Sequence, residues 1–245
     1  MNTVLITGAS GGVAKAAATQ LHDAGWELLR VSRDTDSLDP ALGPVLSADV
    51  SSEDGAQNAL DWACSHFDSP PMAVIHAAGS SLIAPIARTR VDQYRAVMAA
   101  NLDSAFFVAR AYAAAVHKSK QGGSLVLFSS VVARVGVANH AAIAAAKGGV
   151  EALARSLAAD FSACGLRVNC IAPGLMRTPM TARLIASDAG AAQASAQYPL
   201  GRHGEAADAA ALAVFLASAA SAWLSGQVIA LDGGFTAVRP YVKAG

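Results

Sequence analysis

Short apolar runs alternate with alanine-rich stretches along the whole chain, and this alternation restricts the possible folds more than any other feature of the sequence. The apolar runs predict strands at Val4–Thr7, Glu27–Val31, Pro44–Ala48, Ala73–His76, Leu125–Ser129, Arg167–Ile171 and Val228–Leu231. Helices are expected near residues 13–24, 53–66, 91–117, 142–163 and 205–219. Strands that are apolar on both faces and are separated by helices are typical of a parallel sheet covered by helices on both sides. Right-handed crossovers then give an α/β, doubly wound sheet of about seven strands.

Length, charge and composition narrow the class of protein further. The chain has 245 residues, 18 basic and 18 acidic, and 53% of it is hydrophobic. This length fits one large domain or two small ones, and we expect one domain because no repeat or Pro/Ser/Gly-rich linker divides the chain. The absence of net charge predicts no nucleic-acid partner. We expect no membrane span, because no uncharged apolar run reaches about 18 residues, and no signal peptide, because the first residues lead directly into a strand.

The three cysteines predict neither a disulfide framework nor a metal site. Cys64, Cys164 and Cys170 show no paired spacing and no metal-ligand spacing. Unpaired cysteines of this kind usually fill small buried positions in proteins of a reducing compartment. We therefore expect no bound metal and a cytoplasmic location.

The first predicted strand leads into a glycine-rich loop, Thr7-Gly8-Ala9-Ser10-Gly11-Gly12-Val13-Ala14, and then into a helix. Glycines allow the backbone to turn sharply and to approach a pyrophosphate that lies on the helix N-terminus. A glycine-rich loop between a first strand and a helix is the context in which this motif indicates dinucleotide binding. The candidate cofactor ligands in this loop are Thr7, Gly8, Ser10, Gly12 and Val13.

The chain resembles the short-chain dehydrogenase/reductase family over almost its whole length. In the family's loop motif Gly8 and Gly12 match, and Ala14 replaces the third glycine. Further matches lie at Asp49-Val50, His76-Ala77-Ala78-Gly79, Asn101, Pro173-Gly174, Thr178, Pro199-Leu200-Gly201-Arg202 and Asp232-Gly233-Gly234. The resemblance implies one Rossmann-like domain over residues 1–245 that binds a nicotinamide cofactor. It also implies cofactor contacts from Asp49, Val50, Ala77, Ala78, Gly79, Asn101, Lys147, Pro173, Gly174 and Thr178.

The end of the second strand predicts which cofactor binds. An acidic residue at this point accepts hydrogen bonds from a ribose 2′-hydroxyl, whereas Ser32 and Arg33 stand here. The guanidinium of arginine can donate two charge-assisted hydrogen bonds to a 2′-phosphate. We therefore expect NADP(H) in preference to NAD(H). The alternatives are that Arg33 is a solvated charge at the strand end or pairs with Asp34.

The family's catalytic set is incomplete in this chain. The resemblance places its serine at Ser130, its lysine at Lys147 and its relay asparagine at Asn101, but Ile143 stands where the tyrosine is expected. The four tyrosines, Tyr94, Tyr112, Tyr198 and Tyr241, lie elsewhere in the sequence. The loss of one positioned acid typically costs about 10²–10⁴-fold in rate.

Two replacements for the tyrosine's proton are open. His140 would share a helix face with Ile143 and Lys147 if the helix includes position 140. If Asn139 caps that helix, His140 lies in its first turn and its direction is undetermined. Its alternative role is that of a polar residue at the rim of the site. The second replacement is a water molecule held by Ser130 and Lys147.

Residues 175–204 interrupt the alternation and predict a substrate lid, with a plain surface excursion as the alternative. The family resemblance implies a homo-oligomer, a tetramer or a dimer, assembled through the helices at 91–117 and 142–163.

The leading interpretation is an NADPH-dependent reductase of a small-molecule ketone, such as a 3-oxoacyl thioester or a polyketide-like carbonyl compound. The alternatives are a non-redox isomerase, lyase or cyclase on the same fold, and a nucleotide-binding protein without turnover.

Overall fold

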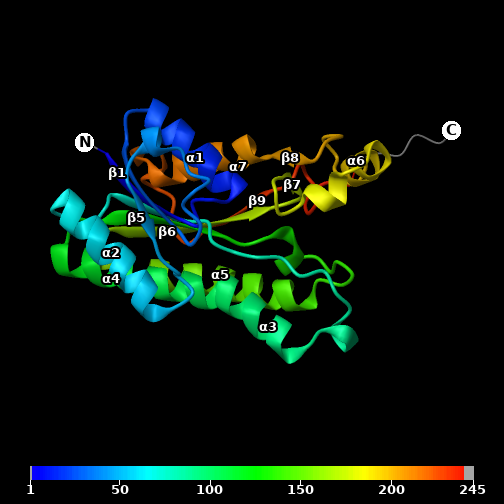
Figure 1. Cartoon of the computed structure of the whole chain (residues 1–245), viewed down its shortest axis with the longest axis horizontal. Coiled ribbons are helices and arrows are strands. Elements are labelled where there is room, and N and C mark those ends of the chain that lie inside the picture. The colour runs from blue at the N-terminus through cyan, green and yellow to red at the C-terminus, as the bar shows by residue number, and fades with distance from the viewer. Residues whose placement is uncertain (1, 240–245) are drawn as a thin grey trace.

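The computed structural model describes residues 2–239, which form a three-layer α/β domain around one sheet (Figure 1). Seven parallel strands follow one another in the order β3-β2-β1-β4-β5-β6-β9. Their bounds are β1 Thr3–Thr7, β2 Glu27–Ser32, β3 Val45–Ser47, β4 Ala73–His76, β5 Gly123–Phe128, β6 Leu166–Pro173 and β9 Val228–Leu231. The predicted doubly wound sheet of seven strands is therefore confirmed, with the third strand shorter than expected.

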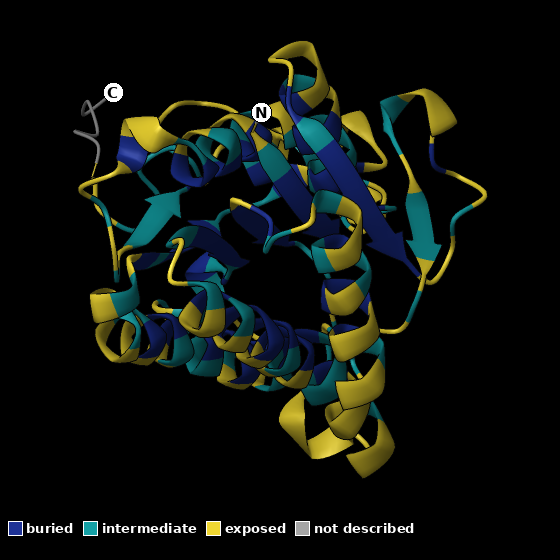
Figure 2. Ribbon diagram, turned by 90° about the vertical axis from the view of Figure 1, so that its left-hand side faces the viewer, coloured by how far each residue is buried: buried dark blue, intermediate teal, exposed yellow. Residues whose placement is uncertain are grey.

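The helices cover both faces of the sheet. On one face α1 (Gly12–Asp23) packs against α7 (Ala206–Ala217), and on the other lie α2 (Glu53–Phe67), α4 (Ser104–Ser119) and α5 (Ala141–Asp160) (Figure 1). Crossovers that place helices on both faces bury the strands from two sides. Figure 2 shows this distribution, since buried residues lie in the strands and on the inner helix faces.

The predicted helix over 91–117 is divided into three parts. Helix α3 (Val91–Met98) continues through a π-helical turn, Ala99–Asp103, into α4. The turn widens the helix by one residue where Asn101 is buried. Such single-turn π bulges occur frequently at functional sites.

A short second sheet marks the segment that was expected to be a lid. Strand β7 (Met176–Arg177) pairs with β8 (Gly204–Glu205), and helix α6 (Asp188–Ser195) lies between them in the sequence. Residues 175–204 thus form an excursion whose two ends are held together at its base.

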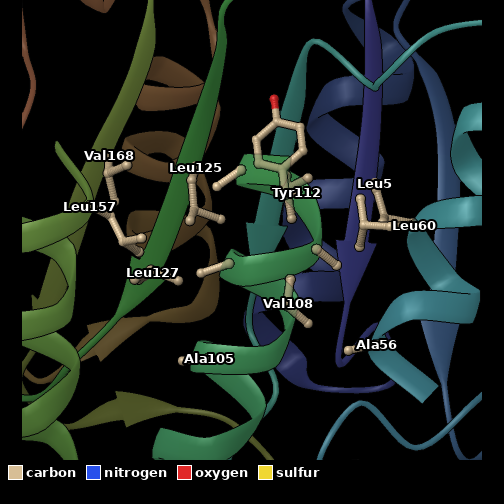
Figure 3. Close-up of a cluster of buried hydrophobic side chains, with 14 of the residues drawn as sticks. Leu5, Ala56, Leu60, Ala105, Val108, Tyr112, Leu125, Leu127, Leu157 and Val168 are labelled. Atoms are coloured by element: carbon tan, nitrogen blue, oxygen red, sulfur yellow. The ribbon is translucent and has the colours of Figure 1, made fainter. Parts of the chain in front are cut away.

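The larger core cluster joins the sheet to α2, α4 and α5 (Figure 3). Its members are aliphatic apart from Tyr112 and Cys170, and alanines allow the helices to approach the strands closely. Tyr112 is completely buried, and its hydroxyl donates to the carbonyl oxygen of Pro71 at 2.8 Å. Burial raises the pKa of the Tyr112 phenol far above its usual range, so this group remains a neutral donor.

No helix within residues 2–239 has both the length and the apolar character needed to cross a bilayer.

The Tyr112 hydroxyl makes a testable contribution to stability. Replacing Tyr112 by phenylalanine leaves the Pro71 carbonyl without its buried donor, and we expect a loss of about 1–3 kcal/mol in the free energy of unfolding. The matched control is Tyr94→Phe, because Tyr94 is partly exposed on α3. Urea unfolding measures both variants, and equal stability of the two would contradict the assignment.

Candidate cofactor and catalytic site

A cleft opens where the loops after β1, β2 and β4 meet at the carboxyl edge of the sheet. Its lining residues are Gly8, Ser10, Gly11, Val31, Ser32, Arg33, Ala48, Asp49, Val50, Ser51, Ala77, Ala78, Gly79, Ala100, Ser104 and Met180. Eight residues predicted as cofactor contacts therefore lie together: Gly8, Ser10, Arg33, Asp49, Val50, Ala77, Ala78 and Gly79. Such a position, outside the carboxyl ends of parallel strands, is where doubly wound sheets bind ligands.

Gly8 allows two loops of this cleft to touch. Its φ is +72°, and a Cβ atom at this position would lie 2.4 Å from the backbone nitrogen of Ala78. Only glycine satisfies both the left-handed conformation and this approach. Gly12 begins α1 directly after the loop, so backbone N–H groups of the helix N-terminus are available to an anion.

The end of β2 carries the residues that are expected to select between NADP(H) and NAD(H). The Ser32 hydroxyl donates to Ser10 Oγ at 2.9 Å, and Arg33 lines the cleft as an exposed side chain. Within residues 2–239, Arg33 forms no ion pair within 4.0 Å, and Asp34 instead accepts from the backbone of Asp36. The alternative of an Arg33–Asp34 pair is therefore absent from this structure.

Asp49 lies on the opposite wall of the cleft. The Ser51 side chain and backbone both donate to its carboxylate, at 2.7 and 3.0 Å. These hydrogen bonds, followed by the charge of Arg33, hold the pKa of Asp49 below its usual value. The carboxylate is thus charged at neutral pH and already satisfied by its own loop.

His76 connects the first and fourth strands to the helix behind the cleft. Ser104 donates its proton to the Ala100 carbonyl, so it accepts from His76 Nε2, 3.1 Å away. His76 Nδ1 is then the acceptor for the Thr7 hydroxyl at 2.7 Å. Burial, followed by the charge of Lys147, lowers the pKa of His76 to about 3. The imidazole is therefore a neutral structural link, and Thr7 lies beneath the glycine loop rather than in the lining.

Asn101 and Lys147 meet beside Gly79. A Cβ atom at Gly79 would lie 2.8 Å from Asn101 Oδ1 and 3.5 Å from Lys147 Nζ. The amide of Asn101 donates to the Val97 carbonyl at 2.9 Å and to the Ser80 carbonyl at 3.2 Å. The π turn presents this amide at the sheet edge, and the structure thereby brings the predicted asparagine and lysine into one site.

Lys147 is buried on α5, and its ammonium donates to the Phe128 carbonyl at 2.8 Å. Burial lowers the pKa of Lys147 to about 8. The next residues along the chain from Phe128 are Ser129 and Ser130, so this hydrogen bond ties the lysine to the loop that carries the predicted catalytic serine. Ser130 begins the short helix that follows β5.

A second layer, which the sequence did not single out, supports this loop. The Ser129 hydroxyl donates to Glu151 Oε1 at 3.0 Å and contacts the Lys147 carbonyl at 3.2 Å. Arg134 donates to both oxygens of Glu151, at 3.3 Å. Glu151 follows Lys147 by four residues, one helical turn. This spacing is the sequence feature that could have indicated that Glu151 lies near the lysine.

Ile143 is buried one turn before Lys147 in a small apolar cluster with Val97 and Ala146. Leu82 and Val132 also pack against this cluster. The side chain at this position therefore contributes packing and carries no acidic or basic group.

His140 lies just outside α5, which begins at Ala141. Asn139 has a φ of +65° and precedes the cap position, so the expectation that Asn139 caps the helix is not met, and His140 occupies that position without a capping hydrogen bond. His140 Nδ1 donates to the Ala138 carbonyl at 2.7 Å. In the neutral ring, Nε2 is therefore an acceptor.

Three tyrosines fall within the described residues, and one of them, Tyr198, packs against the predicted cofactor contact Gly174, where a Cβ atom would lie 2.8 Å from Tyr198 Cε1. Tyr112 is buried in the core, and Tyr94 lies on α3. Tyr198 accepts a hydrogen bond from the Leu175 backbone at 2.7 Å, and its burial raises the pKa of the phenol. Tyr241 lies outside the described residues.

The segment after β7 approaches the glycine loop. A Cβ atom at Gly12 would lie 3.2 Å from side-chain atoms of Thr178 and Pro179, and Met180 lines the cleft. Pro173 ends β6, and Gly174 follows it. A cluster of at least three His, Cys, Asp or Glu side chains that could hold a metal ion is absent from residues 2–239.

These features define a class of protein. A parallel sheet with a glycine-rich loop at its carboxyl edge, and with Asn101 and Lys147 beside Gly79 in the loop after β4, is typical of dinucleotide-binding α/β enzymes. A family model described as enoyl-(acyl carrier protein) reductase matches residues 8–236. The chain belongs to the short-chain dehydrogenase/reductase family, whose members use NAD(H) or NADP(H).

Several known proteins are similar to this chain in sequence and fold over nearly their whole length. An uncharacterized oxidoreductase of Mycobacterium tuberculosis is 34% identical, with 96% of this chain and 91% of that protein covered. A cis-4-hydroxycyclohexanecarboxylate dehydrogenase of Sinomonas cyclohexanicum is also 34% identical, with 96% of each covered. The solved structure of a short-chain type dehydrogenase/reductase from Mycobacterium ulcerans is 30% identical, with a TM-score of 0.88 over 96% of this chain and 89% of that one.

The neutral state of His76 predicts a pH dependence of stability. Its pKa of about 3 in the folded chain lies below the ordinary value of about 6.5, so the unfolded chain binds the proton first. The contribution is present above about pH 6.5 and is lost as the pH falls toward 3. At pH 4–6 we expect the unfolding free energy of the wild type to fall about 1.4 kcal/mol per pH unit more steeply than that of His76→Gln.

The control for this measurement is His22→Gln, because His22 is exposed at the end of α1. It should keep the wild-type slope. If the slopes of the His76 variant and the wild type agree, His76 is not buried in the neutral form.

Proposed function

We propose that the protein is an NADP(H)-dependent oxidoreductase that reduces a ketone. The observation that carries the proposal is the placement of Asn101 and Lys147 beside Gly79, which lines the same cleft as the glycine loop and Arg33. A dinucleotide bound along this cleft would have its phosphates at the loop and its reactive end at the lysine. Ser130, at the end of β5, is proposed to donate to the oxygen of the substrate.

The cleft fits the cofactor in two respects. Its glycine loop has no room for a Cβ atom at Gly8, and it leads into the N-terminus of α1. Arg33 is an exposed cation at the strand end, and Ser32 is small and uncharged. The guanidinium is proposed to bind a 2′-phosphate, and the absence of a carboxylate removes the repulsion that would exclude it. Reduced nicotinamide supplies the hydride in such a site.

The proton for the substrate oxygen is proposed to come from water held by Ser130 and Lys147. Ile143 occupies the position proposed to hold the tyrosine of other members, and it cannot donate. Lys147 has a pKa of about 8, within the range used by tuned acid–base lysines. His140 Nδ1 is engaged by the Ala138 carbonyl, which favours the water over the imidazole.

The apolar cluster around Ile143 suggests which part of a substrate faces it. Leu82, Val132 and Met98 pack with Ile143 and form a hydrocarbon surface near Lys147. We propose a small ketone with an apolar body, a class that includes 3-oxoacyl and polyketide-like compounds and cyclic ketones. Residues 175–204 are proposed to act as its lid.

A homo-oligomer built on α4 and α5 is also proposed. Phe106 lies on α4 with about half of its surface exposed, and small alanines surround it on the same helix. Paired exposed helices with large apolar and small residues suit a self-complementary contact. The cysteine spacing supports a reducing, cytoplasmic location.

Arg33 provides the test of cofactor choice. Its replacement by alanine removes the charge-assisted contact to a 2′-phosphate, and we expect NADPH to bind roughly 10-fold or more weakly, with NADH affinity unchanged. The matched control is Arg88→Ala, since Arg88 is exposed on the short helix Ile86–Arg88. Fluorescence titration measures both cofactors. An equal effect of the Arg33 variant on NADPH and NADH would contradict the assignment.

The position of Ile143 provides the test of the reaction. We expect the wild type to oxidise NADPH in the presence of at least one ketone of a panel that includes 4-oxocyclohexanecarboxylate, 3-oxoacyl thioesters and cyclic ketones. Because the lysine must carry its proton, kcat/KM should fall as the pH rises through about 8. Absorbance at about 340 nm follows the reaction.

Ile143→Tyr and Ile143→Val are measured beside the wild type. The valine variant keeps an apolar wall and should keep the wild-type pH profile. One outcome would contradict the proposal: NADPH binds to both proteins, but only the tyrosine variant reduces a ketone. In that case the natural chain is not a reductase. A non-redox reaction or a binding role then replaces the proposal.

A further inference from the structure

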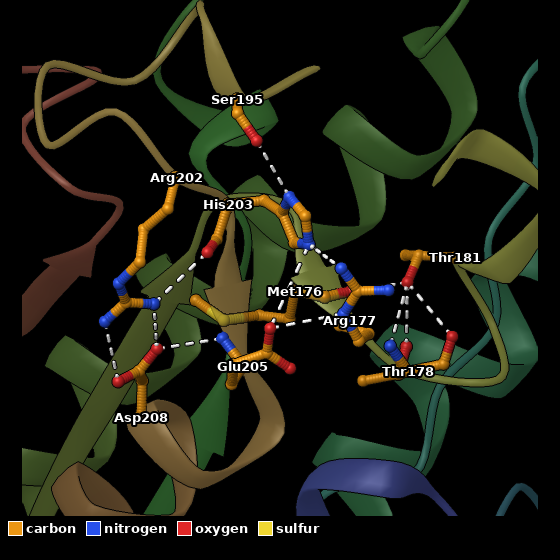
Figure 4. A network of polar contacts seen from close by, with 9 residues as sticks. All are labelled: Met176, Arg177, Thr178, Thr181, Ser195, Arg202, His203, Glu205 and Asp208. Carbon is orange, nitrogen blue, oxygen red and sulfur yellow. Dashed lines mark hydrogen bonds and ion pairs between the residues drawn. The ribbon is translucent and has the colours of Figure 1, made fainter. Parts of the chain in front are cut away.

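The base of the lid contains a buried histidine that joins three elements. We call β7 and β8 the lid stem, and His203 immediately precedes β8. Its Nδ1 lies 3.0 Å from Ser195 Oγ at the end of α6, and its Nε2 lies 2.8 Å from Arg177 Nη2 on β7 (Figure 4). Arg177 Nε also donates to Glu205 Oε1 on β8, at 3.2 Å. We call these four residues the lid latch.

The chemistry of arginine determines which ring nitrogen of His203 carries the proton. A guanidinium has N–H donors and no acceptor, and it stays charged. His203 Nε2 must therefore accept from Arg177, which leaves Nδ1 to donate to Ser195. The latch in this structure thus requires a neutral imidazole, and both nitrogens are occupied in that form.

Protonation of His203 would break this arrangement. A second proton on Nε2 would place an N–H against the N–H of Arg177 and two positive charges in contact. Glu205 Oε1, which accepts from Arg177, also lies 4.0 Å from Nε2, so the imidazolium and Arg177 would compete for the same oxygen. The other charged groups at the stem, Arg202 and Asp208, form a bidentate pair with each other at 2.6 and 3.0 Å.

The latch acts on a segment that reaches the cofactor cleft. Thr178 and Pro179, which directly follow Arg177, pack against Gly12, and Met180 lines the cleft. The latch therefore fixes the start of this segment through Arg177 and its return through Ser195. A small cavity borders the stem, with Met176 and Gly204 in its wall, and it gives the stem space to shift.

We propose that His203 is a positioning residue that, while neutral, holds the lid against the cofactor cleft and, on protonation, releases it. Histidine is the side chain of the latch that can gain a proton, so release is tied to a fall in pH. The consequence is faster exchange of bound dinucleotide at low pH. This inference rests on the proposed function for the identity of that ligand.

The test measures the dissociation rate of NADPH by stopped-flow displacement between pH 8 and 5.5. His203→Gln keeps an acceptor for Arg177 and a donor for Ser195 but does not titrate. We expect the wild-type rate to rise roughly three- to tenfold more than that of the glutamine variant as the pH falls, which corresponds to the loss of about one hydrogen bond. Ionisation of the ligand's phosphate and of Lys147 is common to both proteins and cancels in this comparison.

His203→Phe and His22→Gln complete the set. The phenylalanine variant lacks both hydrogen bonds and should dissociate fast at every pH, whereas the variant at exposed His22 should behave as the wild type does. Equal pH dependence of the wild type and His203→Gln overturns the proposal.

Hydrogen exchange of peptides from residues 178–196 in the ligand-free protein gives a second readout. At pH 5.5 these amides should exchange faster in the wild type than in His203→Gln, and at pH 8 equally, because intrinsic exchange is the same for both at a given pH. Equal exchange at pH 5.5 also overturns the latch. If NADPH does not bind, the cofactor assignment fails, and the exchange comparison alone decides on His203.

Discussion

The approach of the loops after β1 and β4 is the constraint on which the rest of the site depends. Gly8 lies so close to Ala78 that no side chain fits between them, and the Thr7–His76–Ser104 hydrogen bonds hold the same two strands from below. The carboxyl ends of parallel strands meet at one edge, so this contact fixes where a dinucleotide can lie. A neutral, completely bonded imidazole is what makes such a buried polar link stable.

The second requirement is the burial of Lys147. An ammonium removed from water is stabilised only if it has hydrogen-bond acceptors, and the Phe128 carbonyl provides one. The Ser129–Glu151–Arg134 interactions fix the loop that carries this acceptor. The apolar cluster around Ile143 then keeps the lysine poorly solvated, which explains its lowered pKa and places a titrating group where no phenol is present.

The alternation of the sequence was sufficient to predict a parallel sheet of seven strands covered by helices on both faces, and the glycine spacing was sufficient to predict the loop after β1, because these depend on periodicity and local backbone conformation. Other features depend on contacts between distant residues. The π turn at Ala99–Asp103 has no local signature, and the start of α5 after His140 is set by the left-handed conformation of Asn139. The link from His203 to Arg177 joins the two ends of the excursion over residues 175–204, so no local motif indicated it.

The central claim is that this cleft transfers hydride to a carbonyl carbon without a phenolic acid. It is tested most directly by a single turnover with NADPH that carries deuterium at both C4 positions of the nicotinamide, followed by mass analysis of the alcohol formed from an accepted ketone. We expect the product to carry one deuterium on its new carbinol carbon. Tight binding of NADPH with no transfer of the label to any ketone of the panel would contradict it.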